Sequence, residues 1–322
     1  MINLGYTLSS EQYRPNDLIR NGALAEQAGF EFLSISDHFH PWLDSQGHSG
    51  FVWSTLGGLA HATSTIRVGT GVTCPTIRIH PAIIAQAVAS TADMFEGRFY
   101  FAVGSGEYLN EHITGQHWPP ASRRQDMLRE AVALIRKLWE GKYTTEYGHF
   151  YTVENARIYT LPEKLPEIIV AAAGPEAARM AAEIGDGVDS TSPNKEVVET
   201  FEQNGGKGSR YGQMTVCYGP DEQAAAEHAL KVWGNSAVPG QLSQELALPL
   251  YYEQAAQLAT VDQMKESVVC GPDPAKYHEK IKAYVDAGFT HLYIHDVGPD
   301  QAGFIDFSRR ELLPSYGNAS SR

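Results

Sequence analysis

Short runs of apolar residues alternate along the chain with longer stretches in which apolar residues recur every three or four positions. The runs have strand length and predict buried strands, whereas the periodic stretches are typical of amphipathic helices. Strands are expected at residues 2–8, 30–36, 66–72, 98–103, 168–172, 187–191, 214–218 and 291–295. Helices are expected at residues 16–28, 81–95, 123–139, 175–184, 195–204, 221–233 and 300–313.

This repeated strand–helix alternation predicts an α/β fold, a (β/α)8 barrel, more readily than two separate domains. No linker rich in Pro, Gly or Ser divides the chain, so we expect one domain over residues 1–322. Two segments interrupt the alternation. Residues 143–159 alternate like a hairpin around Gly148, and residues 234–273 contain a Pro/Gly loop and a helical stretch near 251–258 that could form a lid.

Bulk composition excludes several classes of partner. A formal charge of −13 disfavours a sequence-independent grip on nucleic acid or on an anionic membrane, although local backbone amides can still hold an anionic cofactor. No apolar run approaches the ~18 residues of a membrane span, and the first residues lack the features of a signal peptide. Three widely spaced cysteines, Cys74, Cys217 and Cys270, favour a reducing compartment. We therefore expect a cytoplasmic protein.

The second expected strand ends in a polar cluster, Ser34-Ile35-Ser36-Asp37-His38-Phe39-His40-Pro41-Trp42. Parallel α/β folds place their chemistry at the carboxyl ends of strands. Asp37 could orient an imidazole, His38 can move a proton near neutral pH, and Trp42 offers a flat apolar wall. These residues predict the floor of an active site.

This cluster has two other interpretations. His38 and His40 could share a metal with a ligand from another strand, but no later strand brings a second His pair, so no metal site is predicted. A solvated loop with incidental histidines is the remaining alternative. A dinucleotide fingerprint is also rejected, because the glycine pairs at residues 69–71 and 104–106 lack a third Gly and a suitably placed acid.

Three further strand ends carry weaker signals. Glu107 follows the fourth strand, where partial burial would raise its pKa and suit an acid role, although a surface charge is the simpler interpretation. Gly71 lies within an apolar run and permits either a close ligand or a simple bulge. Ala173 and Gly174 precede Pro175 at a helix start, which can be an anion cradle or an ordinary turn.

Taken together, these segments resemble the luciferase-like (β/α)8 oxidoreductases, and specifically the branch that uses the deazaflavin coenzyme F420. Within that branch the chain is similar to the F420-dependent glucose-6-phosphate dehydrogenases and to the secondary alcohol dehydrogenase. The resemblance covers nearly the whole chain. It is carried by Gly5-Tyr6, Glu11-Gln12, residues 36–42, 73–76, 104–111 and 124–127, and Gly174-Pro175.

The resemblance implies roles for individual residues. His38 matches the family's catalytic histidine, Trp42 its active-site tryptophan and Glu107 its active-site glutamate. The positions that match contacts to coenzyme F420 are Asp37, Gly71, Val72, Thr73, Cys74, Asn110, Ala173 and Gly174. The family's non-prolyl cis peptide would be Gly71-Val72. A homodimer is also implied, without an interface that the sequence can locate.

The expected reaction is hydride transfer between C5 of the deazaflavin and an alcohol, hemiacetal, sugar or carbonyl carbon, with His38 as the base. Its other ring nitrogen should be held by a carboxylate or a backbone carbonyl. Substrate contacts are expected among Asn194, Lys195, Ser243, Lys265 and Ser267. These offer few cations for a dianionic phosphate, which argues against glucose-6-phosphate as substrate. The alternatives are an F420-dependent glucose-6-phosphate dehydrogenase, an FMN-dependent monooxygenase and a non-enzymatic cofactor-binding barrel.

Overall fold

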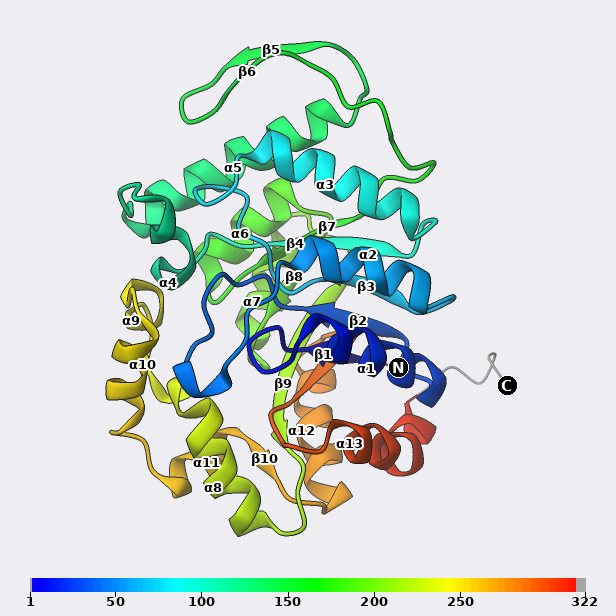
Figure 1. Cartoon of the computed structure of the whole chain (residues 1–322), viewed down its shortest axis with the longest axis vertical. Helices are drawn as coiled ribbons and strands as arrows, with labels where there is room; N and C mark the ends of the chain where they lie inside the picture. Colours follow the sequence, from blue (N-terminus) through cyan, green and yellow to red (C-terminus); the bar gives the residue numbers. More distant parts are fainter. Residues whose placement is uncertain (1, 317–322) are drawn as a thin grey trace.

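The computed structural model describes residues 2–316, and at its centre is a closed barrel of parallel strands (Figure 1). Its strands pair in the order β1-β2-β3-β4-β7-β8-β9-β11, and β11 returns to β1. Their bounds are β1 (Asn3–Leu8), β2 (Phe32–Ile35), β3 (Arg67–Thr70), β4 (Phe99–Val103), β7 (Ile168–Ala171), β8 (Gly187–Ser190), β9 (Arg210–Cys217) and β11 (His291–Asp296). The short β10 (Val269–Cys270) pairs with β9. The predicted (β/α)8 barrel is confirmed.

Helices surround the barrel and follow most of its strands. They are α1 (Pro15–Ala28), α2 (Val52–Ala62), α3 (Pro81–Met94), α4 (Tyr108–Glu111), α5 (Ala121–Leu138), α6 (Pro175–Ile184), α7 (Lys195–Gln203), α8 (Glu222–Trp233), α9 (Leu242–Glu245), α10 (Pro249–Ala256), α11 (Val261–Ser267), α12 (Pro274–Asp286) and α13 (Gln301–Phe307). Helices α2 and α12 and the short helices α4, α9 and α11 were not predicted from the sequence. The last predicted helix is α-helical only to Phe307, and a π-helical turn, Ser308–Leu312, continues it.

The ends of these helices follow from local sequence. Proline occupies the first turn of α1, α3, α6 and α12, where its missing N–H has no helical partner to lose. Asp300 caps α13 by accepting a hydrogen bond from the backbone N–H of Gly303 at 2.9 Å. Gly29 ends α1 in the left-handed conformation at φ 101°.

The barrel interior is filled with side chains, most of them aromatic. Phe32, Tyr100, Tyr211 and Tyr293 form a buried cluster, in which the Phe32 ring meets each of the three tyrosine rings edge-on. Apolar side chains on the outer strand faces form a larger core with the surrounding helices. Because the centre is packed, a ligand has room only at an end of the barrel.

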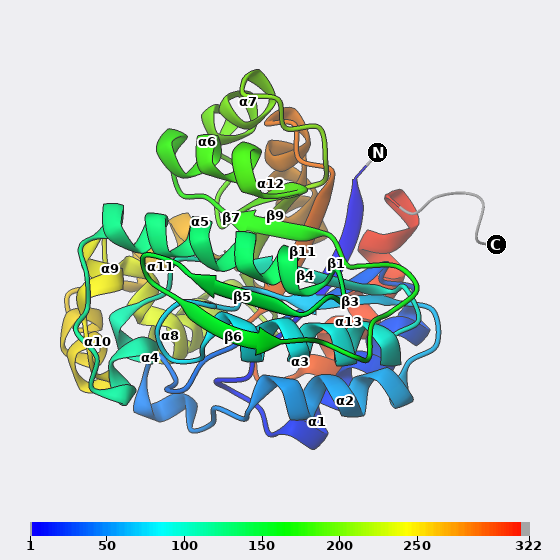
Figure 2. The same cartoon turned by 90° about the horizontal axis from the view of Figure 1, so that it is seen from above.

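Two insertions interrupt the strand–helix alternation of the barrel. The hairpin that the alternation around Gly148 indicates is formed by β5 (Thr144–Tyr147) and β6 (Thr152–Ala156), which lie outside α5 in Figure 1. After α8, a 3₁₀ turn (Gly234–Ala237), α9, α10 and α11 form a second insertion, which we call the lid segment. In both Figure 1 and Figure 2, α9 and α10 lie near α4, at the carboxyl end of the barrel strands. Among the described helices, none is both long and apolar enough to cross a membrane.

Candidate active site

His38 lies just beyond the carboxyl end of β2 and faces a carboxylate from the neighbouring strand. Its Nδ1 is 3.2 Å from Oε1 of Glu11, which follows β1, although the approach is not aligned as an ideal hydrogen bond. The two side chains are only 10% and 4% exposed. Because β1 and β2 pair in parallel, their carboxyl ends meet and bring the two residues together. The carboxylate expected behind the histidine is therefore Glu11.

Glu11 is fixed by hydroxyl groups. Ser9 donates to its Oε2 at 2.9 Å and Ser36 donates to the same oxygen at 2.7 Å. Burial opposes ionisation, but His38, Ser36 and Ser9 together hold the pKa of this carboxyl below its ordinary value. Glu11 is therefore an anion at neutral pH, positioned to orient the imidazole and to stabilise its protonated form.

Trp42 forms an aromatic wall beside the histidine. Its ring meets His38 edge-on at a centroid distance of 4.9 Å and Tyr252 of α10 at 5.2 Å. The backbone N–H of Trp42 donates to Oε1 of Gln46 at 2.9 Å. Tyr252 in turn donates its hydroxyl to the carbonyl of Ser243 in α9 at 2.6 Å. The indole of Trp42 therefore packs between the loop after β2, which carries His38, and the lid segment.

Asp37 does not orient an imidazole, contrary to the expectation from its position beside His38. Its carboxylate accepts hydrogen bonds from Nη2 of Arg78 at 2.9 Å and from the hydroxyl of Thr73 at 2.8 Å. Neighbouring residues of an extended chain point in opposite directions, so Asp37 and His38 cannot share one target. Asp37 instead ties the loops after β2 and β3 together.

Hydrogen bonds to Asn110, which follows β4, hold the loop that carries His38 in place. Oδ1 of Asn110 accepts hydrogen bonds from the backbone N–H groups of Phe39 and His40, at 2.9 and 3.1 Å. Its Nδ2 is 3.4 Å from Oε2 of Glu107, which remains partly exposed. The buried acid in this region is Glu111: burial raises its pKa to about 7, with Arg78 acting in the opposite direction.

The loop after β3 contains the expected cis peptide, between Gly71 and Val72. Val72 is partly exposed, and a Cβ on Gly104 would lie 2.8 Å from its Cγ2. Thr73 and Cys74 are buried and paired within the chain; the thiol of Cys74 lies 3.0 Å from the hydroxyl of Thr76. Burial raises the pKa of this thiol. These two side chains shape the loop and do not face outward.

The turn between β7 and α6 is open. Ala173 is exposed and Gly174 half-buried, and a Cβ added to Gly174 would meet no atom within 4 Å. The free N–H groups of the first turn of α6 follow immediately. Such a turn leaves backbone donors accessible to an anionic group.

The five expected substrate residues are dispersed over three elements. Asn194 caps α7 through Glu196, and Lys195 pairs with Glu199 at 2.8 Å. In the lid segment, the remaining side chains bind close neighbours: Ser243 the carbonyl of Gly240, Lys265 the amide of Gln223, and Ser267 the carbonyl of Gln263. No contact joins these five described side chains into one anion site.

His40 is also turned away from His38. Its Nδ1 lies 2.9 Å from the carbonyl of Leu109, and its ring stacks on His112. Among the described residues, no group of three or more His, Cys, Asp or Glu side chains is arranged to hold a metal ion.

The lid segment is fastened to the barrel by Arg124 of α5. This guanidinium is 1% exposed and donates to Glu245 at 3.2 Å and to Gln244 at 2.9 Å. It also lies over the ring of Trp118, whose Nε1 donates to Glu245 at 2.9 Å. We call these four residues the lid clasp.

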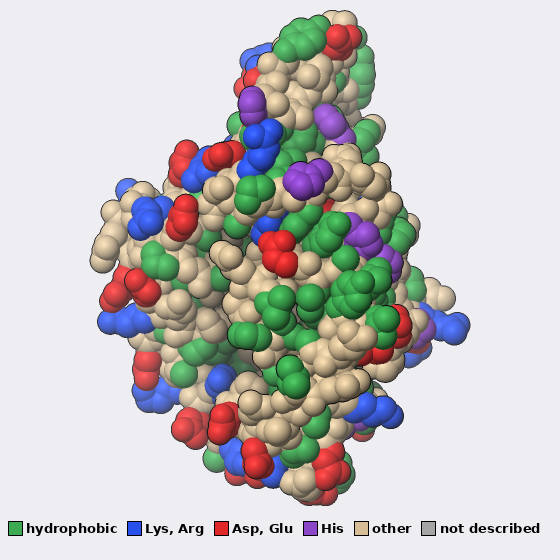
Figure 3. Space-filling view, turned by 90° about the vertical axis from the view of Figure 1, so that its left-hand side faces the viewer, with side chains coloured by type: hydrophobic (Ala, Val, Ile, Leu, Met, Phe, Trp, Pro, Cys, Tyr) green, Lys and Arg blue, Asp and Glu red, His purple; other side chains and the backbone are tan. Residues whose placement is uncertain are grey.

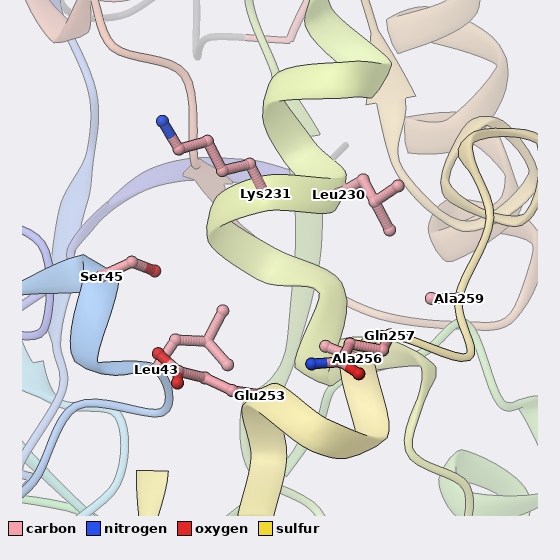
Figure 4. A pocket seen from close by; sticks show the side chains of 8 residues that line it. All are labelled: Leu43, Ser45, Leu230, Lys231, Glu253, Ala256, Gln257 and Ala259. Atoms are coloured by element: carbon pink, nitrogen blue, oxygen red, sulfur yellow. The ribbon is translucent and has the colours of Figure 1, made fainter. Parts of the chain in front are cut away.

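Figure 3 shows the face of the molecule at the carboxyl end of the barrel, where hydrophobic side chains gather in the middle and histidines lie toward one edge. A separate cleft of about 360 Å³ lies between the loop after Trp42, α8 and α10 (Figure 4). Leu43, Lys231 and Glu253 contribute to its lining, and neither His38 nor Trp42 does. This cleft therefore lies between the lid segment and the barrel and is distinct from the site that contains His38.

Sequence reasoning assigned no role to Glu11, Arg78 or Tyr252. Glu11 could have been identified from its position, because it is a carboxylate that follows the strand paired with β2. Arg78 carried no local signal, because its two partners, Asp37 and Glu111, follow other strands. Tyr252 belongs to the irregular lid segment, where periodicity gives little guidance.

A family model described as luciferase-like monooxygenase matches residues 2–291. An F420-dependent glucose-6-phosphate dehydrogenase of Beutenbergia cavernae is 36% identical, over 98% of this chain and 97% of that protein. A relative of the same name from Microbacterium testaceum is 34% identical over 97% of each chain. Among solved structures, an F420-dependent secondary alcohol dehydrogenase in complex with an F420–acetone adduct has a TM-score of 0.92 and 31% identity, over 98% of this chain and 100% of that chain.

Proposed function

The chain belongs to the luciferase-like family, and from that premise we propose that it is a coenzyme F420-dependent oxidoreductase. It transfers a hydride between C5 of the deazaflavin and an alcohol, hemiacetal or carbonyl substrate. The observation that carries this proposal is the His38–Glu11 pair beside Trp42, at the carboxyl end of a barrel similar along its whole length to F420-dependent dehydrogenases.

The residues at this end of the barrel fit such a cofactor. Open space in front of Gly174 and the first turn of α6 suit the phosphodiester tail of the coenzyme. Ala173 borders the same turn, and the partly exposed Gly71-Val72 segment offers a flat backbone and an apolar side chain to a planar ring. Asp37, Thr73, Cys74 and Asn110 contribute by holding these loops in place. When bound, the deazaflavin supplies the carbon that accepts or returns the hydride.

His38 acts as the general base. Because Nδ1 faces Glu11, the other ring nitrogen is the one that can accept the substrate's hydroxyl proton. The charge that develops on the imidazole is stabilised by the buried Glu11 carboxylate, which is already ionised and held by two hydroxyls.

Trp42 and Glu107 complete the proposed machinery. Trp42 packs against the substrate and can donate its indole N–H to the developing alkoxide. Glu107, partly exposed and oriented by Asn110, supplies or accepts a proton as the coenzyme changes redox state. The Trp42 ring packs on the buried Tyr252, and the Glu107 carboxylate accepts a hydrogen bond from the buried Asn110.

We propose an uncharged substrate in preference to a sugar phosphate. The five side chains expected to contact the substrate are already satisfied by a helix cap, an ion pair, backbone carbonyls and a side-chain amide. A dianion would have to break several of these contacts, and it would then meet only two lysines. Comparing glucose with glucose-6-phosphate as substrates tests this choice.

The test of the main proposal is a fluorescence titration of the purified protein with oxidised F420 and, separately, with FMN. We expect tight binding of F420 and weak binding of FMN, followed by loss of F420 absorbance when alcohols or sugars are added. His38→Ala should bind F420 normally and lose turnover. Tight FMN binding with oxygen uptake would instead assign the chain to the monooxygenases, and F420 binding without any turnover would indicate a binding protein.

We also propose that the chain is a homodimer in the cytoplasm. Exposed apolar side chains on adjoining helices support the dimer: Phe51 and Ile83 are 56% and 58% exposed and border the same shallow depression at α2 and α3. Cys74, Cys217 and Cys270 are buried free thiols, which is consistent with a reducing compartment.

A further inference from the structure

His295 lies near the carboxyl end of β11, on the strand face that points into the barrel. Earlier on the same face, Tyr293 donates its hydroxyl to Asp189 at 2.7 Å, and the ring of His291 stacks on Tyr211 with centroids 4.4 Å apart. Because side chains alternate along a strand, His295 points to the same side as these two residues. It therefore belongs to the layer of side chains beneath the proposed active site.

The surroundings of His295 repeat those of His38. Strand β1 pairs with β11 on one side and with β2 on the other, so Glu11 follows the strand that lies between the two histidines. Each imidazole meets an indole edge-on: His38 meets Trp42 at 4.9 Å, and His295 meets Trp233 at 4.6 Å. The site thus contains two imidazole–indole pairs, and the mechanism above uses only one.

Polar atoms on this second side lack partners. Among residues 2–316, neither ring nitrogen of His295 has a hydrogen-bond partner, and the residue is only 3% exposed. The hydroxyl of Thr7, on the neighbouring β1, is also buried without a partner among the described residues. A buried polar group without a partner costs about 1–3 kcal/mol. If a ligand supplies the missing hydrogen-bond partner, this cost is removed, and the free energy of binding becomes more favourable by that amount.

The protonation of His295 restricts which ligand fits. Burial lowers its pKa to about 4, with Glu11 acting in the opposite direction, so the ring is neutral at pH 7. A neutral imidazole offers one donor and one acceptor. A hydroxyl group can pair with either nitrogen, because it both donates and accepts, whereas an aliphatic group would leave both nitrogens unpaired. A phosphate would face a ring without positive charge, close to the Glu11 carboxylate.

We propose that His295 binds a second oxygen of the substrate, next to the oxygen whose proton His38 removes. This inference rests on the proposed function and narrows its substrate class to uncharged vicinal diols and to hemiacetals with a neighbouring hydroxyl. Trp233 forms the apolar boundary of this second position, as Trp42 does for the first. His295 is thereby a residue that determines specificity.

The experiment compares 2-butanol with 2,3-butanediol, which differ by one hydroxyl group. Steady-state kinetics with F420 give kcat and KM for each, and protein fluorescence gives the dissociation constant of each in the presence of F420. The wild-type chain should favour the diol about 10-fold or more, since an unpaired buried partner is worth that much or more. In His295→Phe this preference should disappear mainly through KM, and His295→Asn should restore part of it.

Two controls separate this role from a structural one. His295→Phe keeps the ring packed on Trp233 and removes two unpaired nitrogens, so its midpoint of thermal unfolding should stay unchanged or rise. His291→Phe, on the same strand but at the other end of the barrel, should leave the diol preference intact.

Equal affinity of the wild-type chain for the two alcohols, or an equal loss for both in His295→Phe, would overturn the proposal. If F420 is bound but no hydride is transferred, the proposed function fails, while the fluorescence titrations still decide the role of His295.

Discussion

Oε1 of Glu11 lies 3.2 Å from Nδ1 of His38, although the two residues follow different strands. The contact arises from the parallel pairing of β1 with β2, in which Leu8 is paired with Ile35. Glu11 is held from its other oxygen by Ser9 and Ser36, and this arrangement leaves one carboxylate oxygen for the imidazole. The fold thus fixes which ring nitrogen of His38 can face a substrate.

Glu11→Gln should therefore impair proton transfer while leaving the site assembled. The amide can still contact Nδ1, but it provides no negative charge to the protonated imidazole. We expect kcat/KM to fall about 10²–10³-fold.

The measurement is the pH profile of kcat/KM, with F420 affinity as a check on the integrity of the site. Glu167→Gln, which removes the exposed partner of Arg67, is the matched control and should change neither quantity. An unchanged profile in Glu11→Gln would show that the carboxylate does not act through His38.

Asp189 predicts a pH dependence of stability. Its carboxyl lies inside the barrel, and burial raises its pKa to about 7 from an ordinary 3.8. Between these values the folded state retains a proton that the unfolded state has lost. The free energy of unfolding should therefore fall as pH rises from about 4 to 7 and show no further change from this group above that range.

Asp189→Asn should flatten this decline by up to about 1.4 kcal/mol per pH unit, because the amide keeps an acceptor for Tyr293 but cannot ionise. Urea unfolding at pH 5, 6, 7 and 8 measures the slope. The exposed Asp262→Asn is the control, and identical slopes in the two variants would contradict the assignment.

The strands were predictable from the sequence because both faces of each barrel strand are buried, which produces apolar runs. Helix α12 has buried residues at helical spacing, namely Tyr277, Ile281 and Tyr284, so periodicity alone could have identified it. Helix α2 is harder, since Gly57 and Gly58 lower its intrinsic propensity. Its stability comes from packing on α1 and α3.

The site was only partly predictable, for geometric reasons. His38 and Trp42 share one short segment, so their proximity could be expected. Glu11 reaches His38 only through strand pairing, and Asp37, its sequence neighbour, points elsewhere. Tyr252 reaches Trp42 from the lid segment, where the helical stretch expected near residues 251–258 corresponds to α10. The sequence of that segment does not indicate how the helix docks on the barrel.

The exposed apolar side chains at α2 and α3 provide a test of the proposed dimer. Ile83→Glu places a charge in the depression that Phe51 also borders, and it should convert the proposed dimer to a monomer. Light scattering after size-exclusion chromatography measures the molar mass. Leu258→Glu, at a residue that is 83% exposed in the lid segment, should remain dimeric. A dimer that persists in Ile83→Glu would place the interface elsewhere.

The lid clasp predicts how the lid segment is held over the site. Arg124→Met keeps much of the side-chain volume but removes the donors to Glu245 and Gln244 and the cation over Trp118. Because the guanidinium is buried, its loss should release α9 and, through Ser243 and Tyr252, loosen the wall behind Trp42.

We expect faster amide hydrogen exchange over residues 242–256 and a several-fold higher KM for the substrate, with F420 affinity unchanged. Arg129→Met is the matched control on the same helix, since its ion-pair partners among residues 2–316 are the exposed carboxylates of Asp126 and Glu183. Equal amide hydrogen exchange over the lid segment in Arg124→Met and Arg129→Met would show that the lid clasp does not hold this segment. The contact between Trp42 and Tyr252 would then be sufficient to hold it.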